Sequence, residues 1–423
     1  MKQAHVFFSI NSLVTLFTLI SMLLFPGVLP AQKMDFNIHG YISQGFMISN
    51  HNNFLADTKN GTFQFNELGI NFATEPTDNL RIGLQLIARD LGDIGNDKVL
   101  IDWAYADYRW RDWLGMRLGK IKMPTGIYNK TIDVDMLRTF IFLPQGNYTE
   151  TFRDSLNAMK GIGGYGVTRI PHLGSLSYEA MYGTMNIDND SSTAKGMEGP
   201  GYFEVEKVDV KRTFCCAITW ETPIEGLKLS ASRVDIKLKL QSMTTKDFTV
   251  PVPFPPYKIV IAPAGTPMNS EIPNLNKTIF SIEYTWKNLV LAAEYAMQNF
   301  AQTTRLPDQK TVSREFKFAG FYGSATYRFS DLLETGIYYT EFYKDRDDRD
   351  GTRTPYNPPF SAYQKDACLA LRFDPNPQWT FKIEGHMING TALCFVQDNL
   401  NDAGELTLQK KWYLLAAKMT FSF

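Results

Sequence analysis

The sequence predicts an all-β fold, a transmembrane antiparallel β-barrel of about sixteen strands in a single domain. Three observations predict it: apolar and polar residues alternate with period two in many segments, short and long connections alternate between these segments, and the last strand ends on an aromatic residue, Phe423. The mean hydropathy of −0.22 is too polar for a helical membrane protein of 423 residues. A barrel resolves this conflict, because only every second strand residue faces lipid.

The first 31 residues are expected to be a signal peptide. Lys2 precedes an apolar run over 6–24, Pro26 breaks that run, and Ala31 offers a small residue for cleavage. An uncleaved membrane anchor is the alternative. Cleavage after Ala31 would leave a mature domain of residues 32–423. No stretch of this domain approaches the ~20 apolar residues of a spanning helix.

The final strand shows the alternation most clearly. Tyr413, Leu415 and Met419 share one face, whereas Lys418 and Thr420 share the other. An amphipathic strand of a soluble sandwich is the alternative. A strand that ends the chain after a signal peptide favours the outer-membrane barrel.

Sixteen segments carry strand patterns, bounded by turn residues. The expected strands are 35–49, 62–75, 78–90, 98–110, 113–123, 157–170, 174–185, 207–220, 226–240, 278–286, 288–300, 314–329, 331–344, 361–373, 378–391 and 408–423. The expected long connections are 50–61, 91–97, 124–156, 186–206, 241–277, 301–313, 345–360 and 392–407. Short turns at one end and long loops at the other are typical of outer-membrane barrels.

One strand, 226–240, changes the phase of its alternation near Ser232. This change indicates either a β-bulge or a strand that leaves the membrane.

Two stretches carry a resemblance to a known family. The run "RLGKIKMPTGIYN" at 117–129 and the run "NIHGYISQGF" at 37–46 resemble the Gram-negative outer-membrane porin superfamily, with its general-diffusion and phosphate-selective members. The resemblance implies a third loop that folds inward and narrows the pore, a homotrimer, and a C-terminal strand that is read by the barrel assembly machinery.

The third loop, 124–156, combines charges with an apolar stretch that water would solvate poorly. We expect its charges to form a constriction with bases on the barrel wall, since charges at a narrow point set ion selectivity. Solvated lumen or loop charges are the alternative reading. Lys120 and Lys122 have the wrong strand parity unless a bulge intervenes. The candidate residues are the loop's Asp133, Asp135, Arg138, Glu150, Arg153 and Asp154, and the wall's Arg81, Arg89, Arg117, Lys120 and Lys122.

Other chemistry is sparse, so no metal or cofactor is expected. The histidines and cysteines form no metal-ligand spacing. Cys368 and Cys394 could pair in an oxidising compartment, although free buried thiols are as plausible. The aspartates at 345–350 lack the calcium-loop pattern, because Arg349 stands where an oxygen ligand is needed.

With 43 basic and 44 acidic side chains, the chain offers no basic field for nucleic acid. We expect a passive outer-membrane diffusion porin, not an enzyme, in contact with membrane lipid, lipopolysaccharide and small solutes or ions. The alternatives are a substrate-specific anion or phosphate channel, an outer-membrane lipase or protease, and a structural or adhesive barrel. A ligand-gated transporter would need a plug domain, and only 32–34 precede the first expected strand. The preferred solute and the sign of the preferred ion stay open.

Overall fold

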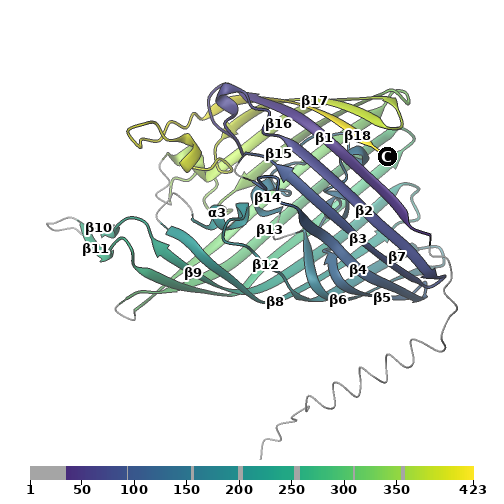
Figure 1. Cartoon of the computed structure of the whole chain (residues 1–423), viewed down its shortest axis with the longest axis horizontal. Helices are drawn as coiled ribbons and strands as arrows, with labels where there is room; N and C mark the ends of the chain where they lie inside the picture. Colours follow the sequence, from purple (N-terminus) through teal and green to yellow (C-terminus); the bar gives the residue numbers. More distant parts are fainter. Residues whose placement is uncertain are drawn as a thin grey trace, which may run out of the picture.

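The computed structural model describes residues 35–423, except 93, 154–156, 199–202, 252–257, 308–309 and 354–357. The expected signal peptide, 1–31, lies outside these residues. Within them, sixteen strands form one closed barrel in which neighbours along the chain pair antiparallel (Figure 1). No helix of the described part of the chain is long and apolar enough to cross a membrane.

The barrel strands are β1 (Asn37–Ser49), β2 (Asn66–Thr77), β3 (Leu80–Asp90), β4 (Leu100–Arg111), β5 (Leu114–Lys122), β6 (Ala158–Ile170), β7 (Gly174–Thr184), β8 (Phe203–Glu221), β9 (Leu227–Thr244), β12 (Pro267–Trp286), β13 (Leu289–Arg305), β14 (Thr311–Arg328), β15 (Leu333–Tyr343), β16 (Tyr363–Asn376), β17 (Trp379–Gly390) and β18 (Lys411–Ser422). A separate hairpin of β10 (Phe248–Pro251) and β11 (Lys258–Ala262) projects from the wall (Figure 1). The helices are α3 (Ser192–Glu198) and the single 3₁₀ turns η1 (Thr58–Asn60), η2 (Asn129–Thr131), η3 (Asp135–Leu137), η4 (Glu150–Phe152), η5 (Pro359–Ala362) and η6 (Gln397–Asn399).

All sixteen expected strands are confirmed, and β1 pairs with β18 to close the barrel. The closure extends to the last residue, because the backbone N–H groups of Gly40 and Phe423 each donate to the other's carbonyl at 3.0 Å. Closure removes the open sheet edges that could not be hydrogen-bonded in lipid.

The outward faces are apolar, as the alternation predicts. On β18 the outward residues Tyr413 and Leu415 are 57% and 49% exposed, whereas the inward Lys418 is 4% exposed. Aromatic side chains gather where the short turns join the strands, as in an interfacial girdle. They include Trp110, Trp113, Trp220, Trp286, Phe329, Trp379 and Phe421.

The expected loop 241–277 is partly wrong, because it contains the end of β9, the β10–β11 hairpin and the start of β12 at Pro267. Loop 186–206 likewise contains α3 and the first residues of β8. These strands continue past the apolar outer band with charged outward residues such as Lys237, Lys239 and Glu271. Apolar alternation does not predict these strand ends, because their outward residues are charged rather than apolar. Most of the proline-rich stretch 251–256 lies outside the described residues.

The phase change at Ser232 is not a bulge. Ser232 pairs with Ala217 on β8 and with Ile279 on β12, and both ladders are continuous there. Instead, the inward face turns apolar beyond this point: Val234 and Ile236 are buried in a cluster inside the barrel.

Candidate functional site

A long connection, residues 123–157, joins β5 to β6 and is not part of the barrel wall. We call it the β5–β6 connection. Pro124 ends the ladder of β5, because it has no backbone N–H. Gly126 then adopts φ 62°, and a Cβ at this position would collide with Tyr148 and Glu294. Only glycine lets the chain turn so tightly against the wall.

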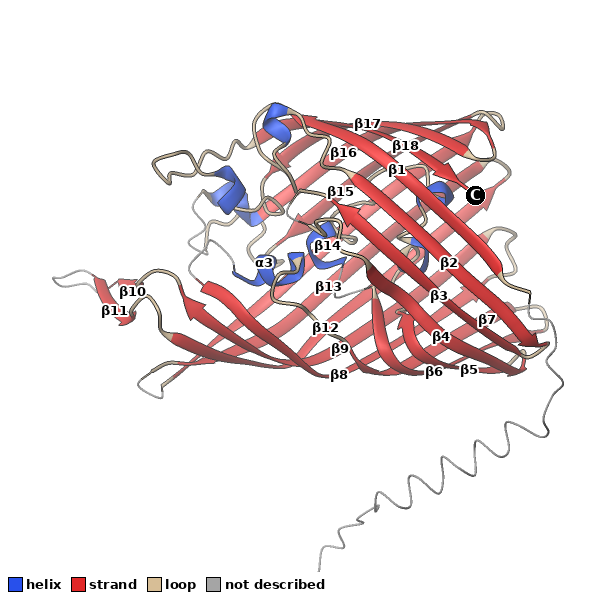
Figure 2. Ribbon diagram, viewed as in Figure 1, coloured by secondary structure: helices blue, strands red, loops and turns tan. Residues whose placement is uncertain are grey.

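The apolar stretch of the β5–β6 connection is buried rather than solvated. Ile141, Phe142 and Leu143 are each at most 2% exposed. Phe142 stacks on Phe65, with ring centroids 5.4 Å apart, and Phe140 meets Tyr338 edge-on at 5.0 Å. Short helical turns are drawn in blue in Figure 2, and those of this connection, η2, η3 and η4, each contain a buried residue.

On one side of the barrel, the β5–β6 connection is fixed by a single carboxylate and its neighbours. Glu294 of β13 accepts from the backbone N–H of Ile127 at 2.8 Å and from the Tyr148 hydroxyl at 2.5 Å. Ser281 of β12 also donates to Glu294. Further along, the backbone N–H of Gly146 donates to the hydroxyl of Thr340 of β15 at 3.2 Å.

A second carboxylate holds the apolar stretch. Glu384 of β17 accepts from the backbone N–H groups of Ile141 at 2.8 Å and Phe142 at 3.0 Å. Because Glu384 faces inward and is fully buried, these bonds tie the connection directly to the inner wall.

A buried network of ion pairs begins at Asp133. This carboxylate accepts from Arg153 Nε at 3.0 Å and pairs with Lys122, which also lies 2.8 Å from Asp102 of β4. Arg153 lies 3.2 Å from both Glu67 of β2 and Glu150. The network therefore joins the connection to three strands.

Two further basic side chains extend the network around the wall. Arg89 of β3 pairs with Glu150 at 2.8 Å, and both side chains are at most 7% exposed. Lys418 of β18 pairs with Glu67 and lies 3.3 Å from Asp135, so it links the network to the next carboxylate.

Asp135 is the second centre of the network. It receives Lys382 of β17 at 3.1 Å and the Thr420 hydroxyl at 2.8 Å, while Arg138 lies 3.7 Å away. Burial alone would raise the pKa of Asp135, but Lys382, Lys418 and Arg138 outweigh it and hold that pKa well below its usual range.

Asp133 behaves in the same way. Its burial opposes ionisation, yet the adjacent Arg153 and Lys122 hold the pKa of Asp133 well below its usual range. Both aspartates are therefore ionised and paired, so their charges are neutralised locally.

Seven predicted site residues meet in this network: Arg89, Lys122, Asp133, Asp135, Arg138, Glu150 and Arg153. Lys122 belongs to it despite its parity: it is the last residue of β5, and it lies 2.8 Å from Asp102, the extra residue of a register shift between β3 and β4. The network is at most 9% exposed, so these side chains do not present their charges to an open lumen.

The other predicted site residues lie elsewhere. Arg117 pairs with Asp107 at 2.8 Å and with Glu179 at 3.4 Å on the inner wall. Lys120 donates to the carbonyl of Ile101, and Arg81 lies near the start of β3, away from the β5–β6 connection. Asp154 lies outside the described residues.

Sequence reasoning missed the wall residues that hold the β5–β6 connection. Those in the network are Glu67, Asp102, Lys382 and Lys418, and those that bind the connection outside it are Glu294 and Glu384. The period-two alternation places Lys382, Glu384 and Lys418 on the polar face of their strands, which was the available signal. It could not show which of these inward residues meet the connection.

A cavity of about 290 Å³ lies beside the start of the β5–β6 connection, against β7, β8, β9 and β12. Two ion pairs line it: Lys130 with Glu179, and Lys228 with Glu283 at 3.7 Å. The two lysine side chains are 44% and 46% exposed, so unlike the buried network they offer charge to open space.

Comparisons with known proteins bear on the fold. No family model matches the sequence, and no curated protein matches it. Solved outer-membrane channels match its structure. The anion-selective porin from Comamonas acidovorans is 10% identical, with 92% of this chain and 100% of that chain covered and a TM-score of 0.54.

Two further structures agree. OmpF of Salmonella typhi in complex with daunomycin is 12% identical, with 93% and 99% of the chains covered and a TM-score of 0.56. The outer membrane channel DcaP of Acinetobacter baumannii is 12% identical, with 94% and 100% covered and a TM-score of 0.51. The chain therefore has the fold of the outer-membrane porins, over nearly its whole length.

Proposed function

We propose that this chain forms a water-filled outer-membrane channel for the passive diffusion of small polar or charged solutes, without catalysis. One observation supports the proposal: in a closed sixteen-strand barrel with an apolar outer band, the backbone of the β5–β6 connection is hydrogen-bonded to the inward residues Glu294 and Glu384. In this proposal the β5–β6 connection narrows the lumen, and membrane lipid and lipopolysaccharide contact the outer band.

The proposal assigns ion selectivity to the charges that face open space rather than to the buried network. Ion pairs that are desolvated and neutralised contribute little field to a lumen, whereas partly exposed charges act on passing ions. Lys130, Lys228, Glu179 and Glu283 line the 290 Å³ cavity with both signs. We therefore expect weak selectivity in the unmodified channel.

The test is single-channel recording of the mature chain in a planar bilayer, with reversal potentials measured across a salt gradient. A folded barrel, recognised by heat-dependent migration on a gel, is expected to conduct. Lys228→Gln should shift the reversal potential toward cation preference, and Glu283→Gln should shift it toward anion preference.

The matched controls are Lys239→Gln and Glu271→Gln. These two residues form an ion pair on the extended, outward ends of β9 and β12. Neither control should change the reversal potential. A folded barrel without conductance contradicts the channel proposal, and a strong anion preference with saturation by phosphate favours the substrate-specific alternative.

We also propose that the channel is a homotrimer, as its resemblance to the porin superfamily implies. Light scattering of the detergent-solubilised, unheated protein should give three times the mass of the chain. A mass equal to one chain contradicts this part of the proposal and leaves the conductance test unaffected.

A further inference from the structure

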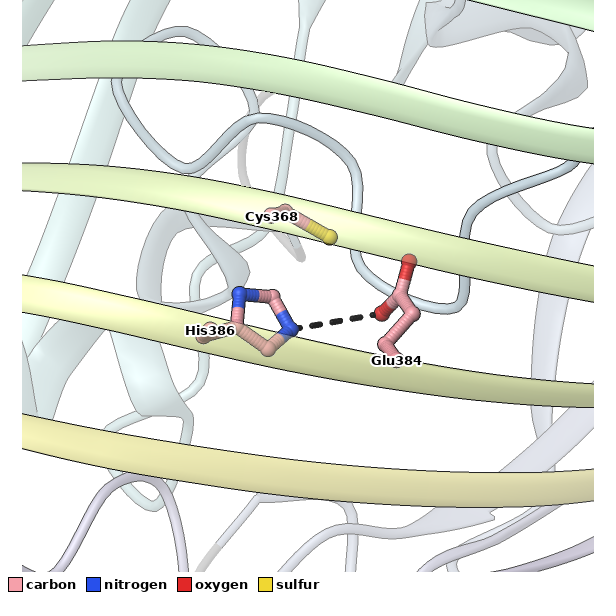
Figure 3. A group of neighbouring side chains, drawn as sticks. All are labelled: Cys368, Glu384 and His386. Carbon is pink, nitrogen blue, oxygen red and sulfur yellow. Dashed lines mark ion pairs between the residues drawn. The ribbon is translucent and has the colours of Figure 1, made fainter.

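A group of metal-ligand side chains lies on the inner wall, apart from the ion-pair network. Cys368 of β16 stands directly opposite His386 of β17, and Glu384 is two residues from His386 on the same inward face (Figure 3). All three side chains are buried, and one possible ligand atom from each lies within 4.8 Å of the others. Thiolate, imidazole and carboxylate are the ligand types that zinc combines in proteins.

The imidazole is oriented as in a metal site. Nδ1 of His386 lies 3.0 Å from Asp366 Oδ2, so Asp366 fixes the orientation of the ring. Nε2 lies 3.4 Å from Glu384 Oε2, in an ion-pair contact without a hydrogen bond (Figure 3). A carboxylate that accepts from one ring nitrogen while the other binds a metal is the usual outer arrangement of metal-binding histidines.

Buried polar atoms are nearly always hydrogen-bonded, but Nε2 of His386, on a side chain that is 3% exposed, has the ion-pair contact to Glu384 and no hydrogen bond. The nitrogen points into the space shared with Cys368 and Glu384 (Figure 3). Zinc bonds of about 2.0–2.3 Å would bring tetrahedral ligands to roughly 3.5 Å from one another. A small contraction of the three side chains would therefore suffice.

We propose that Cys368, Glu384 and His386 bind one zinc ion, with Asp366 as the positioning residue for His386. The thiol selects a borderline-soft ion such as zinc over magnesium or calcium, which prefer oxygen ligands. Binding releases the thiol proton to solvent, because the thiolate is the ligand. Three protein ligands leave a fourth position for water.

The same site holds the β5–β6 connection. Glu384 receives the backbone N–H groups of Ile141 and Phe142, and the Phe142 ring centroid lies 6.2 Å from that of His386. Zinc on Glu384 would fix this carboxylate in place, and so fix the apolar stretch that it anchors. The ion therefore acts as a structural clamp between the wall and the connection. Metal binding does not depend on the proposed function, whereas an effect on conductance would.

The experiment titrates the folded, metal-free full barrel with Co²⁺ as a spectroscopic probe and then displaces it with Zn²⁺. The expected result is one equivalent of Co²⁺ with a sulfur-to-cobalt charge-transfer band. Cys368→Ser should abolish the band and weaken Zn²⁺ binding by about tenfold or more. Cys394→Ser and Cys215→Ser replace buried cysteines outside the cluster and should retain both.

A second readout tests the clamp without any channel measurement. Zn²⁺ should raise the temperature at which the barrel loses its heat-sensitive gel mobility, in the unmodified chain and in Cys394→Ser but not in Cys368→Ser. If Cys368→Ser does not fold, His386→Gln replaces it in both measurements. Absence of the charge-transfer band in the unmodified chain, or an unchanged band in Cys368→Ser or His386→Gln, overturns the proposal. Neither result bears on whether the barrel conducts.

Discussion

The β5–β6 connection is held in different ways on two sides of the barrel. On the ionic side, charged wall residues and charged residues of the connection form one shared network. The wall residues are Glu67, Arg89, Lys382 and Lys418, and the residues of the connection are Asp133, Asp135, Glu150 and Arg153. On the hydrogen-bonded side, the inner faces of β9, β12, β13 and β15 hold the connection through separate contacts to Ser232, Lys277, Glu294 and Thr340.

The two sides differ in how many ionic or hydrogen-bond partners are lost when one side chain is replaced. Asp133, Asp135, Glu150 and Arg153 each have two or more ionic partners, so removing one of them leaves other charges buried without full compensation. Breaking a buried pair in this way costs about 3–5 kcal/mol. On the hydrogen-bonded side, loss of one partner leaves one or a few donors unsatisfied, at about 1–3 kcal/mol. The ionic side should therefore dominate the position of the connection.

Arg153→Met should give the largest effect. Arg153 contacts Asp133, Glu150 and Glu67, so its loss leaves three carboxylates with reduced compensation. We expect the free energy of unfolding to fall by about 3–5 kcal/mol, measured by urea-induced unfolding in detergent. The freed connection should also add fluctuations to the single-channel current.

The matched control for this prediction is Arg233→Met. Arg233 makes a two-point ion pair with Asp235, but its side chain is 44% exposed. Such exposed pairs contribute about 0–1 kcal/mol. An Arg153→Met loss no larger than that of Arg233→Met would contradict the dominance of the ionic side.

Glu294→Gln tests the hydrogen-bonded side. The amide keeps an acceptor, but it loses the charge that strengthens the bonds from Ile127 N–H, Tyr148 and Ser281. We expect a loss of about 1.5–3 kcal/mol in the same unfolding measurement, which is smaller than the loss in Arg153→Met. A loss equal to or larger than that of Arg153→Met would reverse the ranking of the two sides.

The ionic side should also respond to acid. The pKa values of Asp133 and Asp135 are depressed in the folded chain, so their stabilisation is present above the unfolded value of about 3.9 and is lost as pH falls below it. The unfolding temperature should be flat with respect to these groups between pH 5 and 7 and should decline below about pH 4. Asp135→Asn should lower the stability at pH 7 and reduce the acid-dependent decline; an unchanged decline would show that other groups cause it.

The sequence predicts the strands of the barrel wall far better than the contacts that the β5–β6 connection makes with them. Strand alternation is a local property, because each residue's face follows from its neighbours' pattern along one strand. It therefore predicted all sixteen strands and placed Lys418 on the face opposite Tyr413 and Leu415. The length and composition of the loop 124–156 separately indicated its charged residues as candidates for a common site.

The pairing of those charges could not be read in the same way. Lys418 meets Asp135 across 283 positions of the chain, and Glu384 meets Phe142 across 242. Such contacts depend on barrel closure and on the path of the connection, neither of which has a local pattern. Lys122 shows a further limit, because one register shift at Asp102 changes which groups meet. The Cys368–His386 pair was missed because its proximity comes from the register of β16 and β17, not from motif spacing.

Phe142→Leu should give the smallest effect. It tests whether the apolar contacts of the connection help to hold its position. Phe142→Leu removes the stack on Phe65, at about 0.5–1.5 kcal/mol for the aromatic pair. Phe300→Leu removes a similar stack on Phe316, at 4.6 Å, in which the β5–β6 connection takes no part. Both variants should lose similar stability in urea, but only Phe142→Leu should change current fluctuations, because Phe142 belongs to the apolar stretch held by Glu384. Equal current records for the two variants would mean that the polar contacts of the two sides position the connection, and that its apolar contacts do not.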